Sequence, residues 1–511
     1  MILLFSEPAS AFRRLVLLVY SFSISFKKMK QNFFKYFVVG SFCALQTYAQ
    51  NAPSVSGVFP NLAMVANHSP RTEAGTGGLM PWANRLWIIT YVAHMTPTGS
   101  GTGLYEINDK MELKKRAESI VGTYANRFIH ASTYQLIIGP YVVDTLGNVR
   151  LIEGVKKYRL AATMAHLTEP TKKVYFLSME GEFFETDVTT LETKQLFNLM
   201  KELDEPVGSK PHFKSGFTKH GRVVVTNNSY NEKDYNGSWA AGRLAEWDGN
   251  TWKILEKTAF TEVWSAGSFG QPMIATGWDK ASVLMNVYFP STKEWKRYRL
   301  PKGSRTFDET SCTEWMRIRE VETERALMDC HGLFYEIGYH TYGNQLWAIK
   351  PISSHLRIIP DFCSWRGMLV LGGNQATPMR FNSGIDNNPL AGQPQAGLWF
   401  GKTDDLWSFG KLQGEGGVWL DSEIKKGQPS DPFFTFNFNN KSLNLWHNSS
   451  LSVKFDLEAD IVGDGNYRRF QTIIVNPKES KSIDLPESFN PKWVRLVSDK
   501  DCVGTAYFTF K

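Results

Sequence analysis

The chain has 511 residues, of which 14% are aromatic and 21% are charged, and its formal net charge is +7 at pH 7. Residues 1–49 hold six Lys or Arg residues and one Glu, so the rest of the chain carries only +2. Such a near-neutral chain lacks the concentrated positive charge that nucleic-acid-binding proteins need. We therefore predict no nucleic-acid partner.

Residues 1–49 are predicted to be a leader that ends in a secretory signal peptide. A basic stretch from Met29 to Lys35 precedes the apolar residues 36–45, and residues 47–49 form a small-residue cleavage motif. We take Met29 as the true start. We predict an exported protein, in the periplasm, at the cell surface or secreted, with no membrane span after signal removal. An N-terminal anchor is the alternative, although the broken apolar runs fall short of the ~20 residues of a membrane span.

The sequence pattern of residues 53–430 predicts an all-β fold. Segments rich in aromatic and β-branched residues recur there between turns that contain Gly, Asn and Asp. Two segments, Leu244–Trp252 and Leu398–Trp407, combine alternating apolar residues, a polar turn and a second aromatic residue. This pattern is typical of the hairpin in a β-propeller blade, whose aromatic residues fill the space between sheets. At ~40 to 50 residues per blade, the region predicts a seven-bladed β-propeller. A sandwich or a β-helix is the alternative.

Residues 431–511 lack the blade pattern. They contain about six strand-like segments, and Ser452–Leu457 alternates as in a sheet with one buried face. We predict a C-terminal β-sandwich-like accessory region and a monomeric protein. Closure of the propeller by these strands is the alternative.

Four cysteines follow the leader: Cys312, Cys330, Cys363 and Cys502. Their spacing matches no zinc site, so we predict neither a metal nor a cofactor, with a structural Ca²⁺ as the alternative. Export permits a disulfide, and Cys312 with Cys330 is the preferred pair because eighteen residues suit a neighbouring strand. Free buried thiols are the equal alternative.

Candidate functional residues cluster between residues 65 and 144, where titratable side chains interrupt strand-like sequence. Buried imidazole and guanidinium groups cost free energy unless they are paired, so the cluster favours a site for an anionic ligand. We predict His68, His94 and His130 as catalytic residues. The substrate-binding residues predicted here are Arg71, Glu73, Asn126 and Arg127.

The segment from His68 to Glu73 has the composition of a loop that carries binding groups, with a surface turn as the alternative. His94, His130 and His166 lie 36 residues apart in each step, which predicts similar heights in consecutive blades unless the spacing is chance. In a regular strand, Arg127 and His130 point to opposite faces unless a bulge intervenes.

A second polar group lies between residues 212 and 243. Strand ends that carry amides and a tyrosine are common sugar contacts, although asparagine-rich turns also occur for structural reasons. We predict further substrate-binding residues here: His212, Lys214, Tyr230 and Arg243. A stacking platform with an acid is a further possibility, with blade packing as the alternative, for Glu262, Trp264, Trp278 and Asp279.

Four ordered segments carry a family resemblance: NHSPRTEAGTGGLMPWANRLWIITY, TYANRFIHASTYQLIIGPY, GRVVVTNNSY and GRLAEWDGNTWKILE. Over residues 53–430 the chain resembles the exported seven-bladed β-propeller enzymes of Bacteroidetes that act on rhamnose–glucuronate linkages. Those enzymes have been described as α-L-rhamnosidases or as L-rhamnose-α-1,4-D-glucuronate lyases, and they look related to the propeller ulvan lyases. The resemblance implies that a His in the first blade region is the key catalytic residue, and His68 is the matching position.

The chemistry of such a substrate favours elimination over hydrolysis. Removal of the C5 proton of a glucuronate expels the group on C4, while Arg, Asn or protonated His neutralises the developing charge. A glycosidase needs two opposed carboxylates, and this cluster offers only Glu73. We predict β-elimination at C4/C5 of D-glucuronate in rhamnose-containing acidic oligo- or polysaccharides of the ulvan or gum-arabic type, by a lyase or by a dehydratase of terminal glucuronate. The alternatives are an α-L-rhamnosidase acting on rhamnose-α-1,4-glucuronate and a non-catalytic glycan-binding propeller.

Overall fold

A computed structural model of the chain describes residues 63–66, 74–92, 103–120, 125–231, 241–267, 271–304, 316–338, 344–375 and 396–511. The chain divides into two compact units, Met1–Pro53 and Ser54–Lys511, and every described residue belongs to the second unit. The predicted leader lies outside the described residues. The described secondary structure is almost entirely strand, which confirms the predicted all-β class.

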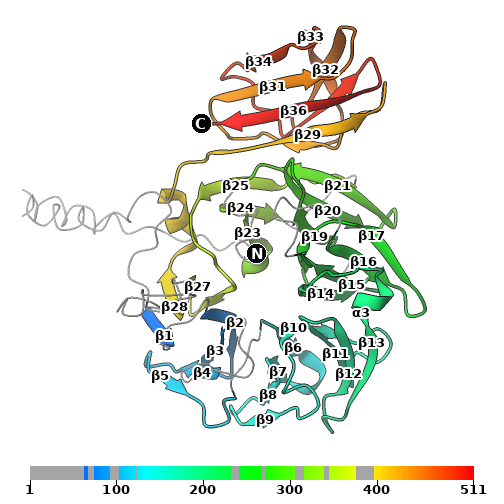
Figure 1. The fold of residues 1–511 in the computed structure, drawn as a ribbon. Coiled ribbons are helices and arrows are strands. Elements are labelled where there is room, and N and C mark those ends of the chain that lie inside the picture. The colour runs from blue at the N-terminus through cyan, green and yellow to red at the C-terminus, as the bar shows by residue number, and fades with distance from the viewer. Residues whose placement is uncertain are drawn as a thin grey trace, which may run out of the picture. The chain divides into compact units, whose positions relative to one another are not determined.

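Four-stranded antiparallel sheets follow one another along the chain (Figure 1). The first four sheets comprise β2 (Ala74–Trp82), β3 (Arg85–Val92), β4 (Gly103–Ile107), β5 (Leu113–Lys115); β6 (Arg127–His130), β7 (Gln135–Ile138), β8 (Tyr141–Val143), β9 (Val149–Leu151); β10 (Leu160–Ala165), β11 (Lys173–Ser178), β12 (Glu182–Asp187), β13 (Thr193–Asn198); and β14 (Phe213–Lys219), β15 (Arg222–Asn227), β16 (Arg243–Trp247), β17 (Trp252–Glu256). Two short helices accompany them, η2 (Ala131–Thr133) and α3 (Leu199–Glu202).

The following sheets comprise β18 (Phe260–Trp264), β19 (Met273–Trp278), β20 (Val283–Phe289), β21 (Glu294–Leu300); β22 (Arg317–Glu322), β23 (Arg325–Cys330), β24 (Leu333–Gly338), β25 (Ile349–Ser354); and β26 (Phe362–Trp365), β27 (Met368–Gln375), β28 (Ala396–Gly401) with β1 (Ala63–Ala66). β1 pairs with β28, so a strand from the start of the described chain completes the last sheet. Ala74 and Gly75 of β2 also pair with β27. First and last sheets are therefore joined.

The first strands of successive sheets form a closed ring. β2 contacts β6, and the contacts continue through β10, β14, β18, β22 and β26 back to β2. The second strands, such as β11 and β23, are almost entirely buried, whereas the fourth strand β5 is exposed. Sheets covered on both faces by their neighbours require such continuous apolar strands. The arrangement is that of a β-propeller-like fold, with the first strands at the centre (Figure 1).

One predicted hairpin is confirmed and the other is wrong. β16 and β17 pair through Trp247 and Trp252, and the Asp248 carboxylate closes the turn by accepting the Asn250 N–H at 2.8 Å. The segment after β28 forms the short helix η5 (Thr403–Ser408) instead of a returning strand. No fourth strand is needed there, because β1 already pairs with β28.

The C-terminal residues form two further groups of strands. One group is β29 (Gly414–Ile424), β36 (Cys502–Phe510), β31 (Lys441–His447) and β34 (Ser480–Asp484). The other is β30 (Phe433–Phe434), β35 (Trp493–Ser498), β32 (Val453–Asp460) and β33 (Arg468–Val475). β29 precedes the predicted boundary at residue 430, yet its partner is β36. The predicted boundary at residue 430 therefore lies too late in the chain, after the first strand of the C-terminal sheets.

The C-terminal strands share a hydrophobic core with the sheets β18–β21 and β22–β25. Phe433 of β30 pairs with Arg299 of β21, which extends one propeller sheet into the C-terminal region. The Trp493 indole donates to the Leu346 carbonyl at 2.9 Å, and its ring centroid lies 4.8 Å from that of Tyr298. The C-terminal region is thus packed into the ring rather than tethered to it.

We expect Trp493→Phe to lower the free energy of unfolding by about 1 to 3 kcal/mol, because the buried Leu346 carbonyl loses its donor. Chemical denaturation followed by circular dichroism measures the effect. The control is Trp407→Phe, since Trp407 is 48% exposed and should tolerate the same change. Equal stability of the two variants would show that this contact contributes nothing.

Candidate functional site

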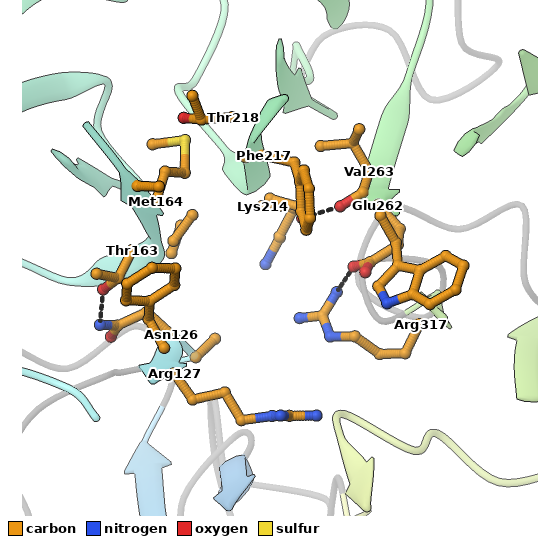
Figure 2. Close-up of a pocket in the computed structure, with 18 of the residues that line it drawn as sticks. Asn126, Arg127, Thr163, Met164, Lys214, Phe217, Thr218, Glu262, Val263 and Arg317 are labelled. Atoms are coloured by element: carbon orange, nitrogen blue, oxygen red, sulfur yellow. Dashed lines mark hydrogen bonds and ion pairs between the residues drawn. The ribbon is translucent and has the colours of Figure 1, made fainter. Parts of the chain in front are cut away.

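A cavity of about 410 Å³ lies within the ring of first strands. Residues of β6, β10, β14, β18 and β22 line it, together with Met80 of β2. Its polar lining residues, most of which Figure 2 labels, are Asn126, Arg127, Thr163, Lys214, Ser215, Thr218, Glu262, Arg317 and Arg319. Cavities of this size at the centre of a closed fold are common ligand sites.

One wall of the cavity is built on a buried carboxylate, that of Asp361. Nε of Arg127 donates to it at 2.5 Å, and Nε of Arg319 donates to it at 2.9 Å. The backbone N–H of Leu79 donates from a third side at 2.8 Å. Burial alone would raise the pKa of Asp361, but the positive charges of Arg127 and Arg319 hold it below its ordinary value. Asp361 is therefore ionised at neutral pH.

Glu262 extends this wall. Its carboxylate accepts from Nη1 of Arg319 at 2.7 Å and from Nη1 of Arg317 at 3.2 Å. Burial lowers the pKa of Arg317, while Asp361 and Glu262 outweigh burial at Arg319 and raise its pKa. We call Arg127, Glu262, Arg317, Arg319 and Asp361 the central ion-pair cluster. Its members come from the sheets that begin with β6, β18 and β22, and from the residue that precedes β26.

The cluster turns its positive side toward the cavity. The side chains of Arg127 and Arg319 are 12% and 17% exposed, whereas those of Asp361 and Glu262 are 1% and 2% exposed. Arg127 and Arg319 are therefore more accessible from the cavity than the carboxylates that hold them, whereas Arg317 is only 2% exposed. Lys214 adds a further cationic lining residue (Figure 2). Among the described residues, four cations face or border the cavity and two carboxylates offset them, which favours an anionic ligand.

The opposite wall carries neutral polar groups. Nδ2 of Asn126 donates to the Gly139 carbonyl at 3.0 Å and to Oγ1 of Thr163 at 2.6 Å. The bond to Thr163 joins the sheets that begin with β6 and β10. Figure 2 shows the Lys214 amine pointing between this pair and Arg317. The two walls thus differ, one cationic and one amide- and hydroxyl-bearing.

The structure brings three of the predicted site residues together, since Asn126, Arg127 and Lys214 all line the cavity. Four others, His68, Arg71, Glu73 and His94, lie outside the described residues. Arg127 also has a structural role, because it makes an ion pair with Asp361, the residue that precedes β26 of another sheet.

His130 does not line the cavity. It is 2% exposed, its Nε2 donates to the Pro170 carbonyl at 2.9 Å, and its Nδ1 lies 2.7 Å from Oγ1 of Thr133. A carbonyl oxygen can only accept, so Nε2 carries a proton, and burial lowers the pKa of His130, which favours the neutral ring. His166 directly follows β10, and its Nε2 lies 2.8 Å from a carboxylate oxygen of Glu185. The 36-residue spacing therefore places one histidine at the end of β6 and one just after β10, and both are buried side chains.

His212, Tyr230 and Arg243 also lie outside the cavity lining. The rings of His212 and Tyr230 meet edge to face with centroids 5.9 Å apart. Arg243 is buried and donates to the carbonyls of Leu203 at 3.0 Å and Gly242 at 2.7 Å. This geometry suits a structural role for Arg243.

Because burial lowers the pKa of His130, its contribution to stability depends on pH. The unfolded state takes up a proton near its ordinary pKa of about 6.5, before the folded state does, so stability falls as pH drops below that value. We expect the melting temperature to decrease from about pH 7.5 to about pH 5, and less steeply in His130→Gln. His220, whose pKa burial also lowers, accounts for part of the remaining slope. Identical slopes in both proteins would contradict this assignment.

Sequence reasoning missed Thr163, Arg317, Arg319 and Asp361. A usable signal existed in Arg317 and Arg319, because two arginines at alternate positions of one strand share a face and need partners if that face is buried. Asp361 gave no signal, since a single Asp between Pro360 and Phe362 reads as a turn residue.

The described cysteines are thiols. Cys330 and Cys363 are buried and free, and Cys502 is also free. The preferred Cys312–Cys330 disulfide is therefore wrong for Cys330, whose Sγ lies 3.4 Å from Sδ of Met316. Cys312 itself lies outside the described residues. The alternative of free buried thiols holds for Cys330 and Cys363.

The described residues show neither a cluster of metal ligands nor a helix that could span a membrane. No group of three or more His, Cys, Asp or Glu side chains there is arranged to hold a metal ion. No helix in the described part of the chain has the length and apolar character needed to cross a membrane.

The closed ring of four-stranded sheets places the chain among propeller-like all-β proteins. No protein-family model and no curated protein matches it. Among solved structures it is similar to the Dos1 propeller, at 11% identity and TM-score 0.36, covering 69% of this chain and 97% of that chain. It is similar to the RRP9 WD40 repeats at 9% identity and TM-score 0.39, covering 67% and 98% of the two chains. Likenesses this distant indicate neither substrate nor partner.

Proposed function

We propose that the protein is an exported enzyme that acts on acidic glycans, by β-elimination at C4/C5 of D-glucuronate in rhamnose-containing oligo- or polysaccharides. The observation that carries the proposal is the cationic face of the cavity, where Arg127 and Arg319 are more accessible than the carboxylates that hold them. A uronate is the sugar that presents a matching carboxylate. The family resemblance of residues 53–430 supports the same substrate class.

The proposed elimination needs fixed positive charge next to the substrate carboxylate, and the arginines of this cavity provide that charge. When a base removes the C5 proton, negative charge develops on the adjacent carboxylate, and fixed positive groups lower the free energy of that transition state. Hydrolysis by a standard glycosidase needs two carboxyl groups free to act on opposite sides of the bond. Glu262 is the carboxylate among the described lining residues, and two arginines already occupy it. Elimination is therefore the better match.

For the fold, we propose a seven-bladed propeller from residue 53 to the residues before β29, with β1 closing the last blade and the strands β29 to β36 as a sandwich-like accessory region. The chain order of the sheets and the pairing of β1 with β28 support seven blades. Two groups of C-terminal strands around one core support the accessory region.

The second candidate is a non-catalytic glycan-binding propeller. One observation favours it: no histidine is found among the described residues that line the cavity. In this candidate the cationic wall holds a uronate without removing its proton. The two candidates differ in whether a catalytic base is present. The predicted bases, His68 and His94, lie outside the described residues.

Incubation with rhamnose–glucuronate oligosaccharides, followed by mass spectrometry, tests the proposal. A lyase gives fragments whose masses sum to that of the substrate, and a dehydratase gives a product that has lost water. Uptake of water would instead identify an α-L-rhamnosidase and overturn elimination. A bound but unchanged oligosaccharide would establish the glycan-binding candidate.

A further inference from the structure

We infer that Arg127 and Arg319 form a clamp for the carboxylate of a glucuronate residue, and that Asp361 positions both side chains. The inference rests on the proposed function, because it names the groups that would hold the anion of that substrate. Arg319 and Asp361 are absent from the residues predicted by sequence.

Asp361 holds two guanidinium groups at once, and Arg127 reaches both carboxylate oxygens, because its Nη2 also donates to Oδ1 at 3.4 Å. Nε of Arg127 donates to Oδ2, and Nε of Arg319 donates to Oδ1. The Leu79 N–H also donates to Oδ2, so the carboxylate itself cannot rotate freely. Side chains from β6 and β22 are therefore fixed next to each other before any ligand arrives. Such preorganisation reduces the entropy that binding would otherwise cost.

Both arginines have N–H donors that no strong acceptor in the described part of the chain occupies. Nη1 of Arg127 contacts the thioether sulfur of Met80 at 2.8 Å, and sulfur of this kind is a weak acceptor. Arg319 donates from Nε and Nη1, and within the described part of the chain its Nη2 has no acceptor. A guanidinium carries five N–H donors, so a ligand in the cavity can be bound by those that remain.

The position of the charges selects the class of ligand. The arginines are partly exposed and line the cavity, whereas Asp361 is 1% exposed. Glu262 also lines the cavity, but its carboxylate is 2% exposed and paired with Arg317 and Arg319, so the accessible charge that a ligand meets is mainly positive. A planar carboxylate accepts parallel hydrogen bonds from guanidinium groups, while a neutral hexose offers hydroxyls alone. Bound there, the carboxylate of a glucuronate is neutralised at the point where elimination places negative charge.

Isothermal titration with D-glucuronate as the probe tests the clamp. We expect Arg127→Lys and Arg319→Lys each to weaken binding roughly 10- to 100-fold, as for the loss of a hydrogen bond between charged groups. The matched control is Arg222→Lys. Arg222 is also a strand arginine paired with a carboxylate, that of Glu246 at 2.7 Å, but it does not line the cavity. This control should keep the affinity of the wild-type protein.

A test of the positioning role of Asp361 must measure a quantity that does not change when the variant is merely less stable. Asp361→Asn, assayed well below its melting temperature, is expected to raise KM for the acidic oligosaccharide with a smaller change in kcat. A purely structural loss lowers the amount of active protein and leaves KM as it was. An unchanged KM would therefore remove Asp361 from substrate recognition.

Several results would overturn the clamp. Wild-type affinity in both arginine variants would do so, as would equal weakening in Arg222→Lys. Displacement of glucuronate by lower concentrations of inorganic sulfate would assign the site to a sulfate ester instead of a carboxylate. If the wild-type protein cleaves the oligosaccharide and both variants keep its KM, the clamp is wrong and the proposed function stands. If the wild-type protein neither binds nor cleaves, both are wrong.

Discussion

Asp361→Asn is expected to lower the free energy of unfolding by about 3 to 5 kcal/mol, because removing one member of a buried ion pair leaves the other charge buried and uncompensated. The substitution keeps the shape of the side chain. It leaves Arg127, Arg317 and Arg319 with Glu262 as the remaining carboxylate of the central ion-pair cluster. Urea unfolding followed by tryptophan fluorescence measures the change.

The control for this prediction is Asp248→Asn. Asp248 is an exposed turn residue that accepts the N–H groups of Asn250 and Thr251, and its replacement should cost about 1 kcal/mol or less. Because the pKa of Asp361 lies below its ordinary value, its contribution is complete above about pH 4 and is lost as pH falls further. The gap between wild type and Asp361→Asn should therefore narrow in acid. A loss no larger than that of Asp248→Asn would show that the cluster does not stabilise the ring.

Local sequence patterns were sufficient for individual sheets but not for their boundaries. The hairpin of β16 and β17 was predictable because turn and strand signals lie within ten residues of each other. The partner of β28 was not, since β1 lies more than 300 residues earlier in the chain. The same limit applies to β29, whose partner β36 is distant in sequence. Strand pairing over such separations depends on the closed ring, which no local pattern encodes.

In the candidate site too, local features could be predicted from the sequence and long-range partners could not. Asn126 and Arg127 were predicted because they belong to the polar cluster between residues 65 and 144, and Lys214 because it belongs to the second polar group between residues 212 and 243. The partners that fix Arg127 and Arg319 were not predicted, because Asp361 is 234 residues from the first and 42 from the second. His130 was assigned a catalytic role on its residue type. Its burial and its bond to the Pro170 carbonyl, 40 residues away, could be seen in the fold alone.

His68→Ala is expected to reduce turnover of rhamnose–glucuronate oligosaccharides by roughly 10² to 10⁴-fold, the usual contribution of a general acid or base. His68 lies outside the described residues, so the prediction rests on its sequence setting beside Arg71 and Glu73 and on the family resemblance. The described cavity lining supplies charge for the carboxylate but no histidine to take the C5 proton. A base from elsewhere in the chain is therefore required if elimination occurs. Steady-state kinetics on purified, folded protein measures the loss.

His130→Gln is the matched control for this last experiment, because His130 is buried, engaged through both ring nitrogens and absent from the cavity lining. Its replacement should lower stability while the folded protein keeps its turnover. If His68→Ala loses turnover but still binds D-glucuronate with wild-type affinity, proton transfer and carboxylate binding are carried by different residues. If a folded His68→Ala protein turns over substrate at nearly the wild-type rate, His68 has no part in the mechanism, and His94 becomes the remaining histidine of the predicted catalytic set.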